Sequence, residues 1–218
     1  MAQRFSPFAD TIARTVLVAI LLVPFAGIGL GYWVANSNYM TGRTYTLDQP
    51  VPFSHEHHVG GLGIDCRYCH TGVTQSTMAG IPPTHTCMTC HSQLYTNTRM
   101  LAPVRESLAD QRPIHWNKVN RLPEYVYFDH SIHVAKGVGC TTCHGSVDRM
   151  PLMRQAAPLT MGWCLDCHRD PAPNLRPEQA IFDPDWSAPS DQRAQGQMLA
   201  EHYHINSAHL TDCSVCHR

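Results

Sequence analysis

The stretch Cys66-Arg67-Tyr68-Cys69-His70 is the first of five Cys-x-x-Cys-His cassettes in this chain of 218 residues. The other four occupy residues 87–91, 140–144, 164–168 and 213–217. This pattern attaches c-type haem, because its two thiols form thioethers to the porphyrin and its histidine becomes the proximal iron ligand. The sequence therefore predicts five haems c, attached through Cys66, Cys69, Cys87, Cys90, Cys140, Cys143, Cys164, Cys167, Cys213 and Cys216, with the proximal ligands His70, His91, His144, His168 and His217.

Zinc sites and redox-active disulfides also use Cys-x-x-Cys pairs, but neither requires a histidine directly after the second cysteine. With 15 histidines in 218 residues, a given position is histidine by chance about 7% of the time. Five such histidines in five cassettes therefore favour haem attachment. The cassettes use all 10 cysteines, so none is left for a disulfide or a catalytic thiol.

The composition is typical of a chain that cannot bury a large core of its own. Charged residues make up 15% of it, there are 16 prolines, and long runs of periodic apolar residues are few. Bound porphyrins would supply the missing apolar volume. We therefore predict a mainly irregular chain with short α-helices wrapped around five c-type haems, plus one N-terminal transmembrane helix. The net charge of −1 gives no sign of nucleic-acid binding.

The N-terminal region contains an uncharged stretch, residues 15–35, that would span about 31 Å as a helix, enough to cross a bilayer. A secretory signal peptide usually has a shorter apolar region, about 7–15 residues, and a small-residue cleavage site, so an uncleaved anchor is favoured. Arg4 and Arg14, against the single Asp10, predict a cytoplasmic N-terminus. The haem-binding part then lies on the periplasmic side of a bacterial cytoplasmic membrane.

An internal repeat of about 75 residues follows the anchor. Its first copy begins with Phe53-Ser54-His55-Glu56-His57-His58 and its second with Phe128-Asp129-His130-Ser131-Ile132-His133, and two cassettes follow each. The predicted organisation is a cytoplasmic N-terminus (1–14), a transmembrane anchor (15–36), a linker (37–50), a first two-haem module (51–110), a second two-haem module (111–170), and an extended strap, a helix and a fifth haem (171–218).

The two Phe-x-His-x-x-His elements predict distal iron ligands. If each element is a helical turn, histidines three residues apart share one face, with β-carbons about 5–6 Å apart. An iron that already holds its proximal histidine has one axial position free, so the two histidines of an element must serve two different haems. We expect His55 to serve the haem of His70, and His130 that of His144. His58 and His133 would then reach other haems.

The fifth distal ligand is less defined by the sequence. Met161 and Met153 flank the fourth cassette, and His209 precedes the fifth by four residues. A methionine ligand would raise the reduction potential of its haem relative to two histidines. Both methionines are also explained as side chains that fill gaps in a core.

Longer phrases around the cassettes resemble a known family. They are residues 51–55, residues 63–70, residues 125–130, and Met161-Gly162-Trp163-Cys164-Leu165-Asp166-Cys167-His168. These phrases, together with the anchor, resemble the pentahaem c-type cytochrome subunit of alternative complex III. The separate modules resemble the class III, cytochrome c7-like multihaem proteins, which use Phe-x-His-x-x-His in this way.

The resemblance implies an electron-transfer subunit, without a catalytic residue of its own, in a quinol-oxidising membrane complex of respiratory or photosynthetic bacteria. The implied partners are quinol-binding integral subunits, an iron–sulfur subunit, a monohaem cytochrome c, a periplasmic electron acceptor and membrane lipid. Two alternatives stay open. One is a stand-alone, membrane-anchored quinol dehydrogenase cytochrome. The other is a multihaem reductase with an open haem site, which usually carries a Cys-x-x-Cys-Lys cassette that this sequence lacks.

Overall fold

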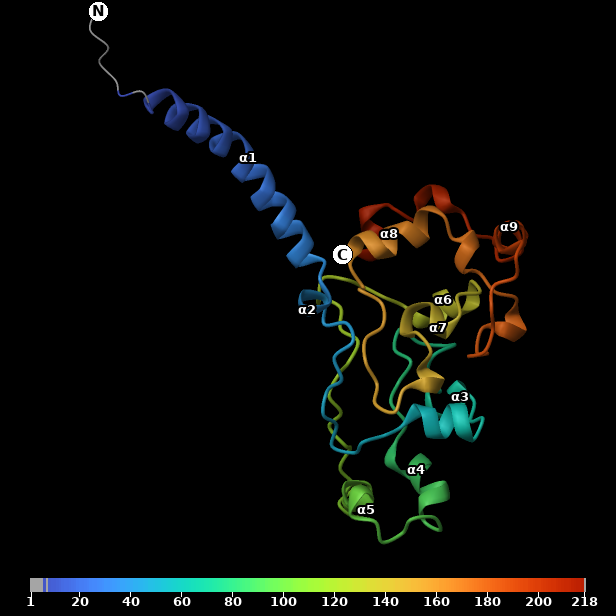
Figure 1. The fold of residues 1–218 in the computed structure, drawn as a ribbon. Helices are drawn as coiled ribbons and strands as arrows, with labels where there is room; N and C mark the ends of the chain where they lie inside the picture. The colour runs from blue at the N-terminus through green and yellow to red at the C-terminus, as the bar shows by residue number, and fades with distance from the viewer. Residues whose placement is uncertain (1–5, 7, 218) are drawn as a thin grey trace, which may run out of the picture. The chain divides into compact units, whose positions relative to one another are not determined.

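The structure is a computed structural model that describes residue 6 and residues 8–217. Arg4, which contributes to the predicted membrane orientation, lies outside the described residues. The chain divides into two compact units, Met1–Gly42 and Arg43–Arg218. Figure 1 shows the first unit as a long helix and the second as short helices joined by irregular segments.

The first unit consists of α1, Ala9–Ala35, and the short α2, Asn38–Thr41. None of the 27 residues of α1 is buried, and the helix continues through Pro24. The helix begins six residues before the predicted anchor. Asp10 and Arg14, one turn apart, form an ion pair of 2.9 Å that stabilises this first part of the helix. Within the described residues, α1 is the helix long and apolar enough to cross a membrane, and a signal sequence would have the same properties.

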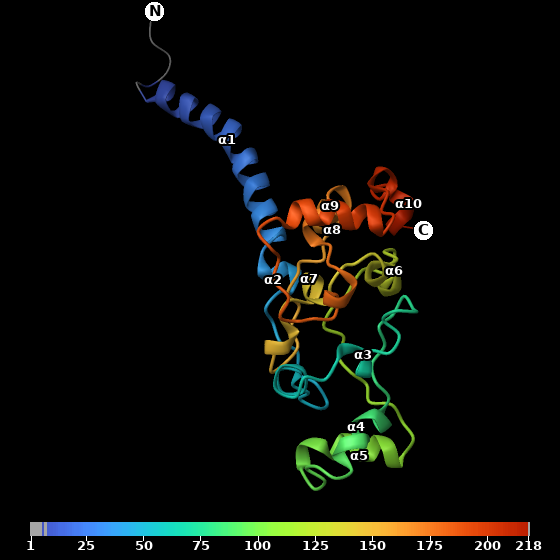
Figure 2. The same cartoon turned by 90° about the vertical axis from the view of Figure 1, so that its right-hand side faces the viewer.

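The second unit contains short helices and no strands among its described residues, as the sequence predicts. Its helices are η1 (Glu56–Gly61), α3 (Cys66–Cys69), α4 (Thr84–His91), η2 (Arg99–Leu101), α5 (Ala102–Ala109), α6 (His130–Ala135), α7 (Cys140–His144), η3 (Val147–Arg149), α8 (Met161–Arg169), η4 (Ala172–Asn174), η5 (Glu178–Ala180), α9 (Gln192–His202), η6 (Ser207–His209) and α10 (Cys213–Cys216). In Figures 1 and 2, α4 and α5 lie at one end of this unit and α8 and α9 at the other, with α3, α6 and α7 between them.

Local sequence explains where the cassette helices begin. The side chain of Asp65 accepts a hydrogen bond from the backbone nitrogen of Arg67 and caps α3. Thr160 caps α8 in the same way through the nitrogen of Trp163. Each cap satisfies a backbone donor that the first helical turn leaves unpaired. The cassette cysteines therefore lie on short helices with defined starts.

The protein atoms alone form a thin core. Among the described residues, the buried apolar side chains are Val51, Val73, Val104, Met150, Ala157, Ala172, Leu175, Ala180 and Ile181. Of these, Met150 and Leu175 are the large ones that are fully buried. A conventional domain of this length buries many more large side chains, so the side-chain core of the second unit is small for its length.

The longest helix of the second unit, α9, packs closely on η4. Gly196 in α9 is buried, and a β-carbon built there would lie 1.9 Å from the carbonyl oxygen of Ala172. No side chain fits at that distance. Gln192 also donates to the carbonyl oxygens of Ala172 (3.1 Å) and Leu175 (2.8 Å), which fixes the start of α9 against the same segment.

We predict that Gly196→Ala destabilises the second unit, because the added methyl group must push α9 away from Ala172. The expected loss is about 1–3 kcal/mol, measured as a lower midpoint of thermal unfolding of the full chain. Gly162→Ala in α8 is the matched control, since a β-carbon there meets no atom within 4 Å. Equal midpoints for the two variants would contradict the close packing.

Candidate haem centres

Four pairs of histidine rings face each other across the second unit. The ring centroids of His55 and His70 lie 6.5 Å apart with planes at 7°, and those of His130 and His144 lie 6.4 Å apart at 3°. Two metal–imidazole bonds of about 2 Å, with the ring radius on each side, require a separation of about 6.4 Å. Both pairs therefore have the spacing that two axial ligands of one metal need.

The second histidine of each element faces a different cassette. His58 lies 6.2 Å from His91 at 62°, and His133 lies 6.1 Å from His168 at 27°. Rotation of a ring about the common axis changes the angle but not the spacing, so these pairs fit the same requirement. One element thus reaches two cassettes, as the geometry of a helical turn predicts. The first element is wound as the π-helix η1 and the second as the α-helix α6.

The phenylalanine of each element explains how the two rings are held. Phe53 stacks on His58 at 4.3 Å and meets His55 edge-on at 4.9 Å. Phe128 does the same in the second copy, with stacking on His133 at 4.5 Å and an edge contact to His130 at 4.7 Å. One aromatic ring therefore fixes the orientation of both imidazoles.

Hydrogen bonds at Nδ1 fix the tautomer of most of these rings. Seven rings donate Nδ1–H to a backbone oxygen: His70 to Gly80 (2.7 Å), His91 to Leu94 (3.2 Å), His168 to Leu210 (2.8 Å), His217 to Tyr125 (3.1 Å), His58 to Ser54 (2.8 Å), His130 to Thr77 (2.8 Å) and His133 to Asp129 (2.7 Å). A carbonyl oxygen only accepts, so the ring proton lies on Nδ1 and the lone pair on Nε2. A histidine that binds a metal through Nε2 needs this tautomer, and here the carbonyl oxygen that accepts from Nδ1 holds it in place.

Burial lowers the pKa of three of the facing rings, His55, His133 and His144. Burial and the neighbouring His70, His58 and His144 lower the pKa of His55 to about 4. Burial, with His130 and His70 nearby, lowers the pKa of His144 to about 4. A neutral imidazole has a free lone pair. The ring nitrogen Nδ1 of His55 is also buried without a hydrogen-bond partner.

The alternatives to haem fit these residues poorly. A structural zinc site needs four protein ligands, and the described residues contain no cluster of three or more His, Cys, Asp or Glu side chains arranged to hold a metal ion. All ten cysteines are unpaired. A haem iron needs only two axial protein ligands, and each facing histidine pair supplies two. The donor sets therefore fit haem.

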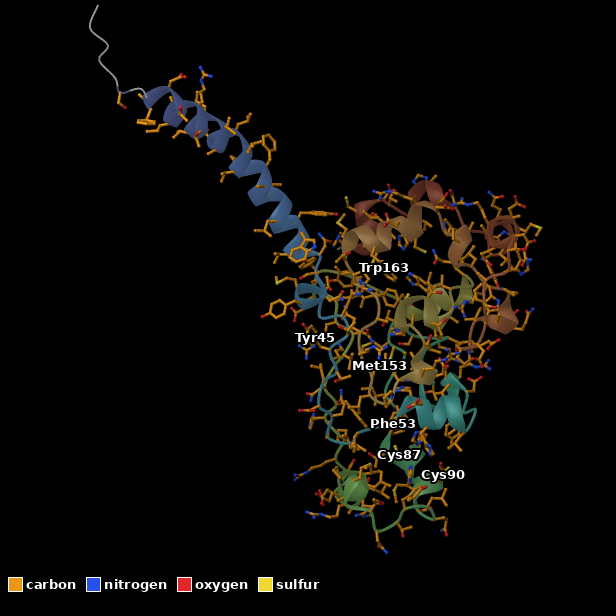
Figure 3. All side chains as sticks on the ribbon, viewed as in Figure 1. Tyr45, Phe53, Cys87, Cys90, Met153 and Trp163 are labelled. Carbon is orange, nitrogen blue, oxygen red and sulfur yellow. The ribbon has the colours of Figure 1, made fainter. Side chains whose placement is uncertain are left out.

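The cassettes are not arranged in the order of the sequence. Thiols of different cassettes lie close to one another. Burial, with Cys87 nearby, raises the pKa of Cys69; burial, with Cys167 nearby, raises that of Cys143; and burial, with Cys216 nearby, raises that of Cys164. Cys66 shares a hydrogen bond with Cys140. In space, the cassettes therefore follow one another in the order second, first, third, fourth and fifth. Figures 1 and 2 agree, with α4, α3, α7 and α8 following one another along the unit. In Figure 3, Cys87 and Cys90 lie toward the α4 end and Trp163 toward the other.

The segment after α8 joins the first and third cassettes. The carbonyl oxygen of Ile181 accepts from the backbone nitrogen of Cys140 (3.3 Å). The neighbouring Phe182 accepts from Sγ of Cys66 (4.0 Å), and its ring carries the guanidinium of Arg67 at 4.4 Å. The sequence predicts only an irregular strap here. Its role in holding two cassettes together follows from the structure.

Arg176 is the functional residue of this strap that sequence reasoning missed. It is 5% exposed, and its guanidinium stacks on Trp186 at 4.4 Å. It donates to Oγ1 of Thr141, inside the third cassette, and to the carbonyl oxygen of Asp183 at 3.2 Å. A β-carbon at Gly139 would lie 2.3 Å from its Nε, so a larger residue at this position would have to displace the Arg176 side chain.

The fifth cassette is held differently. His217 forms an isolated bridge with Val126, and the carbonyl oxygen of Cys216 accepts from the nitrogen of Tyr127 at 2.8 Å. Among the described residues, no second histidine ring stacks opposite His217; its ring neighbour is Tyr125 at 5.8 Å.

The three predicted donors for the fifth distal position do not form such a pair in the structure. Met161 is 63% exposed, Met153 is half-buried, and the exposed His209 lies 3.2 Å from the carboxylate of Asp212 through Nδ1. All three stay predictions.

Comparison with known proteins agrees with this chemistry. Residues 51–107 match the family model of cytochrome c7 and related cytochrome c. This segment contains the first Phe-x-His-x-x-His element and the first two cassettes. Over 178 residues the chain is 28% identical to the menaquinone reductase, multiheme cytochrome c subunit, of Nitratidesulfovibrio vulgaris (Hildenborough), covering 78% of this chain and 77% of that protein. These matches support the predicted cytochrome c7-like character of residues 51–107, and haem attachment along the rest of the chain and the number five stay predictions.

We predict that Arg176→Gln destabilises the second unit by about 1–3 kcal/mol, because the shorter side chain leaves the carbonyl oxygen of buried Ala180 without its donor. The measurement is the midpoint of thermal unfolding of the full chain. Arg169→Gln is the control: Arg169 is exposed and lies 3.7 Å from Asp166, so its loss is expected to change the midpoint little. A change as large in the control would contradict the role given to Arg176.

Proposed function

We propose that this chain is an electron-transferring, five-haem c-type cytochrome and a subunit of a quinone-linked membrane complex. The observation that carries the proposal is the set of four facing histidine pairs, each built from one cassette histidine and one histidine of a Phe-x-His-x-x-His element. When bound, each haem supplies reversible one-electron chemistry. The polypeptide supplies axial ligands, fixed orientation and burial.

The proposed ligand assignment follows the facing pairs. His70 and His55 hold the first haem, His91 and His58 the second, His144 and His130 the third, and His168 and His133 the fourth. The ten cassette cysteines form the thioethers, and His217 is the proximal ligand of the fifth haem. Because each element contributes to two haems, its short helix fixes the separation between neighbouring centres.

Two histidine ligands on an iron leave no position for a substrate. Four of the five proposed centres are of this kind, which supports an electron carrier over a reductase with an open haem site. The fifth centre is the exception, and we propose that Met161, Met153 or His209 completes it. The alternative of a multihaem reductase would require that the iron of the fifth haem lacks a distal protein ligand.

We further propose that the complex is alternative complex III, in which the chain passes electrons from quinol oxidation to a periplasmic acceptor. The apolar helix α1 supports membrane attachment, and the relative is named as a subunit of a menaquinone reductase. In this proposal the N-terminus is cytoplasmic and the haem-binding unit periplasmic. Quinol-binding integral subunits, an iron–sulfur subunit and a monohaem cytochrome c accompany the chain.

We predict that His58→Ala and His133→Ala each convert one haem from low spin to high spin, because each removes one of two imidazoles from an iron. Electron paramagnetic resonance of the oxidised protein measures the spin states, and pyridine haemochrome analysis should still give five haems c per chain. His57→Ala is the matched control: it is the neighbour of His58, it is exposed, and its ring pairs with no cassette histidine. Unchanged low-spin spectra in both test variants would refute the ligand assignment.

We predict that the chain, purified gently from native membranes, co-purifies with integral subunits and an iron–sulfur protein, and that added quinol reduces its haems within this complex. The isolated chain should not oxidise quinol, because in this proposal the quinol-binding integral subunits supply the quinone site. Quinol oxidation by the isolated chain would favour the stand-alone quinol dehydrogenase. Haems that are oxidised by quinone but never reduced by quinol would reverse the proposed direction of electron flow.

A further inference from the structure

Asn120 makes an exceptional contact to a cassette histidine. In the first, second, fourth and fifth cassettes, Nδ1 of the histidine donates to a backbone carbonyl. In the third cassette, the side-chain amide of Asn120 lies 3.1 Å from Nδ1 of His144. Both residues are half-buried, and Asn120 comes from the irregular segment between α5 and α6. The third cassette is therefore the one in which a side chain, rather than a backbone carbonyl, contacts Nδ1 of the cassette histidine.

The chemistry of His144 decides which amide atom faces it. If Nδ2 of Asn120 donates to Nδ1, the ring proton must lie on Nε2, and Nε2 then has no lone pair for an iron. If Oδ1 faces the ring, Nδ1 keeps its proton and the lone pair lies on Nε2. The ring of His130, 6.4 Å away and parallel at 3°, requires the second arrangement if both rings bind one iron.

Nothing holds the amide of Asn120 against that arrangement. Its Oδ1 is buried and has no hydrogen-bond partner on the side away from His144. The amide oxygen and nitrogen occupy nearly the same space, so a half-turn of the amide needs no other atom to move. After the half-turn, His144 has the same Nδ1–H to oxygen hydrogen bond as the four other cassette histidines.

We propose that Oδ1 of Asn120 accepts the Nδ1 proton of His144, and that Asn120 is thereby a positioning residue that sets the reduction potential of the third haem. The proposal rests on the haem ligation proposed above. An acceptor at Nδ1 makes the imidazole a stronger donor at Nε2, which favours the oxidised iron and lowers the potential. Asn120 acts through His144 and does not touch the iron.

The position of this cassette gives the contact its importance. The third cassette is the middle one of the five, between the first, through Cys66 and Cys140, and the fourth, through Cys143 and Cys167. His144 is also half-buried, and burial is the main cause of its lowered pKa. A hydrogen bond in a low-dielectric site has a larger electrostatic effect than one in water. A single side chain can thus set the driving force at the middle of the chain of haems.

The test is a redox titration of the full chain with its haems attached, comparing Asn120→Asp and Asn120→Leu with the parent protein. We expect Asn120→Asp, a stronger acceptor, to lower the potential of one haem, and Asn120→Leu, which removes the acceptor, to raise it. Each shift should be about tenfold in the oxidised-to-reduced ratio, or about 59 mV for one electron. The other four potentials should stay in place.

Two further variants make the result interpretable. His130→Ala, which removes the ring opposite His144, identifies the third haem by the loss of its low-spin resonance signal. Asn206→Asp is the charge control, because Oδ1 of the exposed Asn206 accepts from the nitrogen of Ala208 and a carboxylate can do the same. The control should leave the third potential unchanged.

The proposal is overturned if Asn120→Asp leaves the third potential in place, or if both Asn120 variants shift it in the same direction. A shift spread over all five haems would also overturn it, because a charge effect without the hydrogen bond would act in that way. If Asn120→Leu does not retain its haems, Asn120→Asp and the serine variant Asn120→Ser, which keeps an acceptor, decide the question. If five haems c are attached and the Asn120 variants leave all five potentials unchanged, only this inference is refuted. If no haem c is attached, the proposed function is refuted.

Discussion

The second unit depends on pairs of histidine rings held 6.1 to 6.5 Å apart. That spacing leaves room for one metal atom and its two bonds. It is maintained without the metal by two kinds of contact, an aromatic ring between the histidines of each element and a hydrogen bond from Nδ1 to an oxygen. Burial lowers the pKa of His55, His133 and His144, which favours the neutral imidazole that a metal ligand needs.

The same constraint explains why the chain has so little conventional structure. A short helical element places two histidines on one face, and each then reaches a different cassette. The chain between these elements must follow the positions of the centres rather than the geometry of a sheet or bundle. Turns, single helical turns and the prolines of the segment after α8 serve this purpose. The few buried apolar side chains gather where segments meet, as Leu175 does beside η4 and Val138.

The two copies of the repeat share their internal geometry but differ in their surroundings. Phe53 and Phe128 contact their histidines in nearly the same way. The third cassette, however, lies under the strap that contains Arg176, and the amide of Asn120 faces its histidine. The first cassette meets that strap from the other side through Cys66 and Arg67. Duplicated modules thus acquire distinct environments, which is how identical ligand sets can have different reduction potentials.

The sequence by itself determined the short-range chemistry of this protein. Cysteine and histidine spacing identified the cassettes, and the three-residue spacing of His55/His58 and His130/His133 implied two haems per element, because both features depend only on neighbours along the chain. The helices around residues 9–35 and 192–202 were foreseeable for the same reason. Only the tertiary structure decided that His58 faces His91 and His133 faces His168, that the second cassette lies at one end, and that Arg176 and Asn120 serve the third. These contacts join residues 24 or more positions apart, and no local pattern records which distant segments pack together.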